Sequence, residues 1–200
     1  MDQRSSPVER PVDDVDLVGE EAVANLVRAA LFAALVGAFA YVSFPNPLSP
    51  APITLQVLGV FLAGIMLGPK WGSVSLVLYL LAGALGAPVF AAGSAGLGVL
   101  LGPTAGYLWS YPVAAGAIGL LVHGGSDVVK PERVGIPRLV GAMVVGTAIV
   151  YAFGIVGMMF VQNVGLVTAF WQGAAAFLPA EAFKIAAAVG IVRSDVIRAR

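Results

Sequence analysis

The stretch LVGAMVVGTAIVYAFGIVGMMFV, residues 139–161, contains no charged side chain. An apolar run of about 20 residues is long enough to cross the hydrocarbon core of a bilayer as a helix. A helix also satisfies its own backbone hydrogen bonds, which lipid cannot do. The stretch therefore predicts a transmembrane helix and places the chain among membrane proteins.

The composition of the whole chain agrees with this interpretation. Of the 200 residues, 59% are hydrophobic and 11% are charged, whereas soluble domains carry about 25% charged residues. Lys70 is the only Asp, Glu, Lys or Arg in residues 29–126, and Glu181 and Lys184 are the only ones in residues 139–192. The chain has no cysteine, which excludes disulfides and thiolate metal sites.

The apolar runs predict an all-α integral membrane protein with six transmembrane helices. The period-2 alternation of a membrane β-barrel is absent from the sequence. Gly, Pro and Ser punctuate the short second and third runs, which indicates kinked or partly re-entrant segments. The predicted spans are Leu26–Phe44, Ile53–Leu67, Gly72–Leu85, Pro103–Val122, Leu139–Val161 and Ala174–Val192.

The distribution of basic residues predicts the orientation. With six spans, residues 45–52, 87–102 and 162–173 form connections on one side, and they hold no charged side chain. The basic residues flank the spans on the other side, which is cytoplasmic by the positive-inside rule. Both termini are therefore predicted to be cytoplasmic. The basic residues that flank the spans on this side are Arg28, Lys70, Lys130, Arg133, Arg138, Arg193, Arg198 and Arg200.

Composition also divides the chain into domains. Residues 1–25 hold seven acidic residues and two arginines, and we expect them to form a disordered acidic cytoplasmic tail. Residues 26–193 form the predicted six-helix membrane domain, and residues 194–200 a short basic tail.

The segment FLPAEAFKIAAAVG, residues 177–190, places Glu181 and Lys184 in an otherwise apolar helix. Their spacing of three brings the two side chains to one helical face. They are either an internal ion pair between helices or part of a site, and charges within a span usually mark a pathway or a site. We favour a ligand site for a small molecule that has N–H donors and a carbonyl acceptor.

The predicted topology brings further polar residues to the same depth. The second, fourth and sixth spans begin at the outer face, and their positive N-terminal ends would converge on an outward-facing pocket. Thr54 and Gln56 begin the second span, and Thr104 and Tyr107 begin the fourth. Gln56 is interpreted as a ligand contact or as an interhelical hydrogen-bonding residue.

The remaining candidates are less specific. Tyr79 and Tyr107 either contact a ligand or pack in the core, and Ser94 with its neighbouring glycines offers N–H groups to an anion. The only histidine, His123, is placed in a cytoplasmic loop, so the chain lacks the parts of a hydrolase triad or a histidine metal cluster. We predict no catalytic residue, no metal and no cofactor.

The first span repeats small residues every four positions in two registers. Such faces permit close approach of helices within a membrane, either inside the protein or with a partner. One register is Ala30, Ala34 and Ala38, and the other is Ala29, Ala33 and Gly37.

The motifs APITLQVLGVFLAGIMLGPKWG, YLLAGALGAPVF, LLGPTAGYL and FLPAEAFK stand in an order and spacing that resemble the BioY family. These proteins are the biotin-binding S components of energy-coupling factor (ECF) transporters. The resemblance runs from about Leu26 to Val192. It implies the six-helix S-component fold, high-affinity capture of biotin from outside, and location in the cytoplasmic membrane of a prokaryote. It also implies partners, namely a transmembrane scaffold subunit and two cytosolic ATPases.

The resemblance also implies roles for residues. Lys184 and Glu181 match the positions that contact the ureido ring in the family, although here Ala180 replaces a glycine and Glu181 an aspartate. Phe90 would lie against the apolar part of biotin, below the loop of residues 44–51.

Two further contacts have candidate residues, namely the one to the biotin carboxylate and the one to the scaffold subunit. Ser94, Thr104 and Tyr107 are candidates for the biotin carboxylate. Ala30, Ala34 and Ala38 resemble the small-residue motif that meets the scaffold.

Three alternatives stay open. The first is a solitary ion-coupled secondary transporter of biotin or another small vitamin, with Glu181 as proton carrier. The second is an S component for another vitamin, and the third is an integral-membrane enzyme. The last is disfavoured, because the predicted pocket lacks a nucleophile paired with a base.

Overall fold

The computed structural model describes residues 19–125 and 127–194, and these are predominantly helical. The main elements are α1 (Glu20–Ala40), β1 (Ser43–Phe44), β2 (Ile53–Thr54), α2 (Gln56–Ala84), α3 (Ala105–His123), α4 (Ile136–Gln162), α5 (Leu166–Gly173) and α6 (Leu178–Arg193). Short 3₁₀ turns lie at Ala91–Gly93, Val99–Leu101, Pro131–Arg133 and Ala175–Phe177. The predicted all-α class is thus correct, apart from a small antiparallel ribbon that pairs Ser43 with Thr54 and Phe44 with Ile53.

Five helical stretches are long and apolar enough to cross a membrane. The last of them combines α5, the turn Ala175–Phe177 and α6. Neighbouring helices pack in the order α1, α2, α3 and α4, while α6 contacts α2 and α4. The stretches are Glu20–Ala40, Gln56–Ala84, Ala105–His123, Ile136–Gln162 and Leu166–Arg193.

Helix α2 joins the second and third predicted spans and breaks between them. Gly68 has φ 76° and ψ −176°, a conformation open to glycine, and Pro69 follows it. Ala63 and Gly72 are nine residues apart, which corresponds to about 13.5 Å along a straight helix. In the structure, however, a methyl group added at Gly72 would lie only 3.0 Å from the carbonyl oxygen of Ala63. The second half of α2 therefore folds back along the first, with no separate loop.

The break leaves a backbone carbonyl that another helix satisfies. Pro69 has no N–H, so the carbonyl of Ile65 loses its helical donor. Nε2 of His123 lies 3.0 Å from that oxygen, and Nδ1 of the same ring accepts the N–H of Val129 at 3.1 Å. This arrangement requires the proton on Nε2. His123 is therefore the buried last residue of α3, and its predicted place in a loop was wrong.

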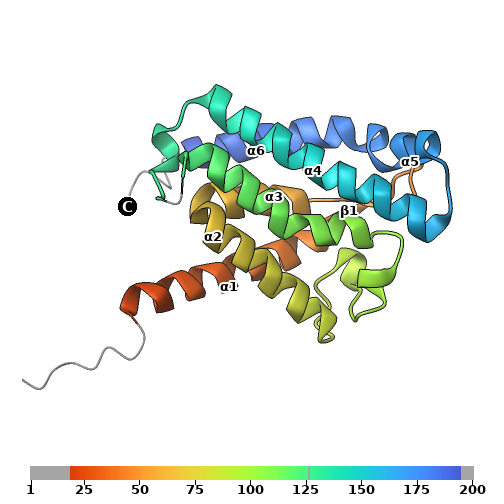
Figure 1. Ribbon diagram of the computed structural model, residues 1–200, viewed down its shortest axis with the longest axis horizontal. Coiled ribbons are helices and arrows are strands. Elements are labelled where there is room, and N and C mark those ends of the chain that lie inside the picture. The colour runs from red at the N-terminus through yellow and green to blue at the C-terminus, as the bar shows by residue number, and fades with distance from the viewer. Residues whose placement is uncertain (1–18, 126, 195–200) are drawn as a thin grey trace, which may run out of the picture.

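The connections gather at two opposite ends of the bundle (Figure 1). At one end the break in α2, the α3–α4 connection and the end of α6 meet, since Val128 packs on Gly68 and the Arg193 guanidinium donates to the carbonyls of Glu132 and Val134. At the other end the β1–β2 connection approaches the start of α6, where the Asn46 amide donates to the Ala176 carbonyl at 3.4 Å.

Several predicted boundaries differ from the structure. Helix α1 begins at Glu20, not Leu26, because Glu20 and Glu21 in its first turn interact favourably with the positive end of the helix. Helix α5 occupies residues predicted as a connection, and its eight residues are too few to register as a span. The rest of the acidic tail and the basic tail lie mostly in residues 1–18 and 195–200, outside the described part.

The two small-residue registers of α1 have different surroundings. Ala29 and Gly37 are buried and Ala33 is half-buried, and Gly37 packs on Val89. The other register is exposed along the outside of the bundle and consists of Ala30, Ala34 and Ala38. Only the first register is thus used for packing within the described part of the chain.

Replacing His123 with alanine is expected to destabilise the protein. The change leaves the Ile65 carbonyl buried without a donor, which costs about 1–3 kcal/mol and lowers the melting temperature by about 2–4 °C per kcal/mol. Thermal unfolding in detergent measures the effect. His123→Gln, whose amide can still donate, should lose less, and equal melting of the wild type and His123→Ala would contradict the role.

Candidate ligand-binding site

A cavity of about 600 Å³, its open mouth included, lies among α2, α3, α4, α6 and the α2–α3 connection. It is a concave space that several helices enclose, as is usual for small-molecule sites. The N-terminal parts of α2, α3 and α6 all reach it, as the sequence predicted. The predicted site residues that line it are Gln56, Phe90, Ser94, Thr104, Tyr107, Glu181 and Lys184.

The ion pair of α6 forms the most polar wall of the cavity. Nζ of Lys184 donates to Oε1 of Glu181 at 2.6 Å, and each residue is 4% exposed. Pro179 in the first turn supports the start of α6 here. Oε2 of Glu181 is buried and has no hydrogen-bond partner among the described residues. The pair thus closes on itself through one oxygen and leaves a second acceptor for a ligand.

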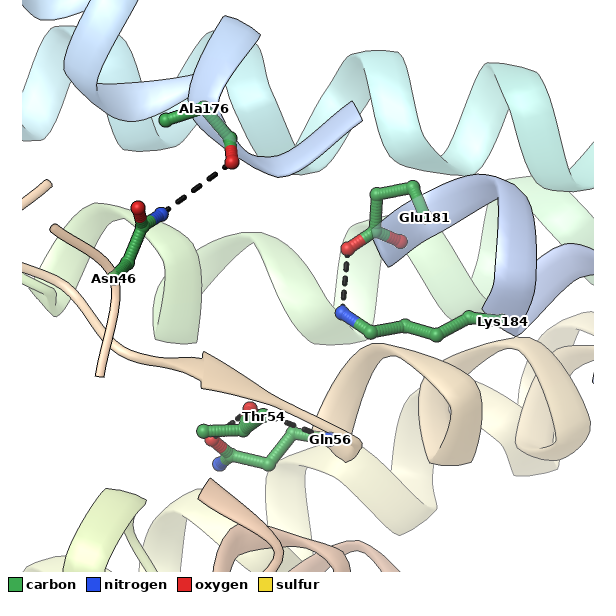
Figure 2. A network of polar contacts seen from close by, with 6 residues as sticks. All are labelled: Asn46, Thr54, Gln56, Ala176, Glu181 and Lys184. Carbon is green, nitrogen blue, oxygen red and sulfur yellow. Dashed lines mark hydrogen bonds and ion pairs between the residues drawn. The ribbon is translucent and has the colours of Figure 1, made fainter. Parts of the chain in front are cut away.

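Gln56 lies at the start of α2, facing the same space as the ion pair (Figure 2). Its Oε1 accepts from the Thr54 hydroxyl at 2.9 Å, and its Nε2 donates to the Tyr79 hydroxyl. Tyr79 is only 1% exposed and does not line the cavity. Tyr79 therefore packs behind the cavity in this structure, where its hydroxyl holds the Gln56 amide.

Phe90 supplies the apolar wall next to Gln56. Its ring meets Tyr79 edge-on, with centroids 5.5 Å apart and an interplanar angle of 81°. The ring lies so close to Gly83 that a methyl group there would overlap it. Glycine at position 83 thus allows Phe90 to pack directly on the α2 backbone and remain fully buried.

A second aromatic group lies on the side of α3 and α4. The ring centroids of Tyr107 and Tyr151 are each 6.4 Å from that of Phe177. The Tyr107 hydroxyl donates to the Gly173 carbonyl at 2.7 Å and so holds the end of α5. That proton is engaged, so Tyr107 offers a ligand mainly its ring surface.

The two candidate anion contacts are not equivalent. The Ser94 hydroxyl and backbone N–H both donate to the Ala91 carbonyl, at 2.8 and 3.3 Å. Thr104 stands at the N-cap of α3, where its side chain makes no capping hydrogen bond. The Thr104 hydroxyl and the first turn of α3 are therefore better placed to meet an anion than Ser94.

The structure adds cavity residues that sequence reasoning missed. Tyr111 follows Tyr107 by one helical turn, so its position on the same face was predictable. Tyr151 and Phe177 had no comparable signal, because only packing of α4 on α6 brings them to the cavity.

Comparison with known proteins identifies the family of this chain. The model of the BioY family matches residues 8–199. The chain belongs to the BioY family. Two relatives called biotin transporter BioY show the extent of the match. The Rhizobium etli protein is 35% identical over 86% of this chain and 93% of its own length, and the Rhodobacter capsulatus protein is 40% identical over 71% and 73%.

A solved structure has the same fold as this chain. It is the S component for biotin from an ECF-type ABC transporter, and it aligns with a TM-score of 0.80 at 26% identity. The alignment covers 92% of this chain and 95% of the other. The S-component fold is thereby confirmed for this BioY-family chain.

Removing only one charge of the ion pair is expected to destabilise the ligand-free protein more than removing both. Lys184→Met leaves Glu181 buried without a cation, and breaking a buried pair costs about 3–5 kcal/mol. The double variant Glu181→Leu/Lys184→Met removes both charges and should recover most of the loss. Melting temperatures in detergent test this, and a double variant no more stable than Lys184→Met would contradict it.

Proposed function

We propose that this chain is the substrate-binding S component of an ECF transporter and that it captures biotin with high affinity at the outer face. The observation that carries the proposal is the buried Glu181–Lys184 pair with its free acceptor inside the cavity. The ureido ring of biotin has two N–H donors and one carbonyl, which match this set. The biotin transporters and the S component reported above support the same ligand.

The cavity suggests an orientation for biotin. Lys184 donates to the ureido carbonyl, while Oε2 of Glu181 accepts from one N–H. Phe90 and the apolar walls pack on the thiophane ring and valeryl chain, and Gln56 lies beside them. The carboxylate extends toward Thr104 and the N-terminus of α3. The connection of residues 44–51, whose Ala51 lines the cavity, covers the bound ligand.

The break in α2 supports six crossings of the cytoplasmic membrane of a prokaryote. Its halves run in opposite directions, so each counts as one crossing, although the first is short. Lys70 and the basic α3–α4 connection then lie on the same side as the start of α1 and the end of α6. The positive-inside rule makes that side cytoplasmic.

The exposed register of α1 supports a partner within the membrane. Ala30, Ala34 and Ala38 form a stripe of small exposed side chains along α1, which suits close packing against another helix. We assign it to the scaffold subunit, which two cytosolic ATPases would drive. In this scheme the chain performs no covalent chemistry, and ATP hydrolysis elsewhere powers release of biotin to the cytoplasm.

Calorimetry on the purified protein tests the ligand. Biotin should bind, while thiamine and riboflavin should not, because their polar groups do not match the Glu181–Lys184 set. Lys184→Ala is expected to weaken biotin binding by more than tenfold, the equivalent of at least about 1.4 kcal/mol. Unchanged binding by Lys184→Ala, or preference for another vitamin, would contradict the assignment. Uptake by the chain alone in ATPase-free liposomes would favour an ion-coupled secondary transporter.

Enlarging the exposed face of α1 should separate binding from transport. Ala34→Leu is expected to leave biotin binding unchanged but to reduce ATP-dependent uptake several-fold, because the scaffold helix can no longer approach. Ala152→Leu on the exposed side of α4 is the matched control. Equal uptake by both variants in proteoliposomes with the complete complex would argue against this interface.

A further inference from the structure

A second, more open hollow lies at the end of the bundle opposite the ligand cavity, where the α3–α4 connection leads into α4 (Figure 1). Three basic side chains line it, namely Lys130 and Arg133 from the connection and Arg138 from the first turn of α4. Capture of biotin in the other cavity does not involve this hollow. The rest of its lining is apolar or glycine and consists of Val128, Val129, Val134 and Gly135.

The three basic side chains are exposed and lack an acidic partner. In the described part of the chain, no salt bridge joins Lys130, Arg133 or Arg138 to a carboxylate. Asp127 and Glu132 belong to the same connection, but neither lines the hollow. The hollow therefore presents positive charge to its surroundings, which attracts an anion.

Hydrogen bonds to α3 and α6 hold the backbone of the hollow in place. The Arg193 guanidinium on α6 donates to the carbonyls of Glu132 and Val134. Nε of Arg138 donates to the Leu121 carbonyl near the end of α3, at 2.6 Å. The hollow is thus formed in advance of any ligand, and an anion bound there would join the ends of three helices.

An apolar row runs from the hollow along the outside of α4. Ile136, Val140 and Val144 are four residues apart, which places them on one helical face. Ile136 and Val144 are exposed and Val140 is half-buried. Helix α4 is long and apolar enough to cross a membrane. A phospholipid beside α4 therefore brings an acyl chain to this row and its headgroup to the hollow.

We propose that the hollow binds the headgroup of an anionic phospholipid of the inner leaflet. The three cations hold the phosphate, and the row on α4 receives an acyl chain. Basic pockets at the cytoplasmic ends of transmembrane helices are a common way to bind such headgroups. A soluble phosphate meets the same cations but gains nothing from the apolar row. The inner leaflet follows from the orientation proposed above, whereas the site itself does not depend on biotin.

The first test compares ligands on the full chain in neutral detergent. A molecule that binds only the folded protein raises its melting temperature. We expect added phosphatidylglycerol to raise it, while phosphatidylcholine and inorganic phosphate at the same concentration should not. An equal rise with phosphatidylcholine would mean a nonspecific lipid effect, and an equal rise with phosphate would mean an adventitious ion only. Either result overturns the proposal.

The second test removes the cations that have no structural contact to lose. Lys130→Gln/Arg133→Gln should weaken phosphatidylglycerol binding about 25-fold, at about fivefold per basic residue, the equivalent of about 1 kcal/mol each. Both side chains are exposed, so the melting temperature without lipid should stay unchanged. Arg138 is kept, because its loss would also free the Leu121 carbonyl. Unchanged lipid affinity in the double variant would overturn the proposal.

The matched control compares two single arginine variants. Arg133→Gln should lose about fivefold in phosphatidylglycerol affinity, whereas Arg28→Gln should lose almost none, because Arg28 is exposed on α1 and does not line the hollow. Equal losses would show that the lipid responds to overall charge and not to this site. If Lys130→Gln/Arg133→Gln instead blocks assembly with the other transporter subunits at unchanged lipid affinity, the hollow is a protein contact. That outcome also contradicts the proposal.

Discussion

The ion pair of Lys184 and Glu181 constrains the whole binding site. Two charges held in an apolar environment need partners for every donor and acceptor, or they cost several kcal/mol. Here one contact of 2.6 Å joins the opposite charges, and among the described residues the second carboxylate oxygen has no hydrogen-bond partner. The cavity around them is where a ligand can satisfy those groups. The ion pair forms the polar wall of this cavity, and apolar side chains such as Phe90 and Val150 form much of the remainder.

The reversal of α2 makes this cavity possible. Gln56 begins the helix and Phe90 follows its end, and a straight helix of 29 residues would separate its ends by about 40 Å. Because the chain turns back at Gly68 and Pro69, both residues reach the same cavity. The turn lies at the end of the bundle opposite the cavity. There His123 satisfies the carbonyl that Pro69 leaves without a donor. The binding site therefore depends on a backbone feature far from it.

The cavity and the exposed face of α1 occupy different parts of the chain. The cavity lies among α2, α3, α4 and α6, and α1 contributes no residue to its lining. Helix α1 packs on the bundle through Ala29 and Gly37 and leaves Ala30, Ala34 and Ala38 exposed. A side chain change on that exposed face alters the surface of the bundle without reaching the ligand. This separation suits a protein that binds a small molecule itself and leaves energy coupling to other subunits.

The sequence by itself determined the membrane class, the ion pair and several of the residues that line the cavity. Hydropathy reports transfer into lipid directly, and residues three apart on a helix, such as Glu181 and Lys184, must share a face. Only the tertiary structure decided that Tyr151 faces the same cavity as Glu181, that Tyr79 stands behind Gln56, and that the Ser94 donors are engaged. These facts depend on how helices distant in sequence rotate and pack against one another. The periodicity of a single helix carries no information about that packing.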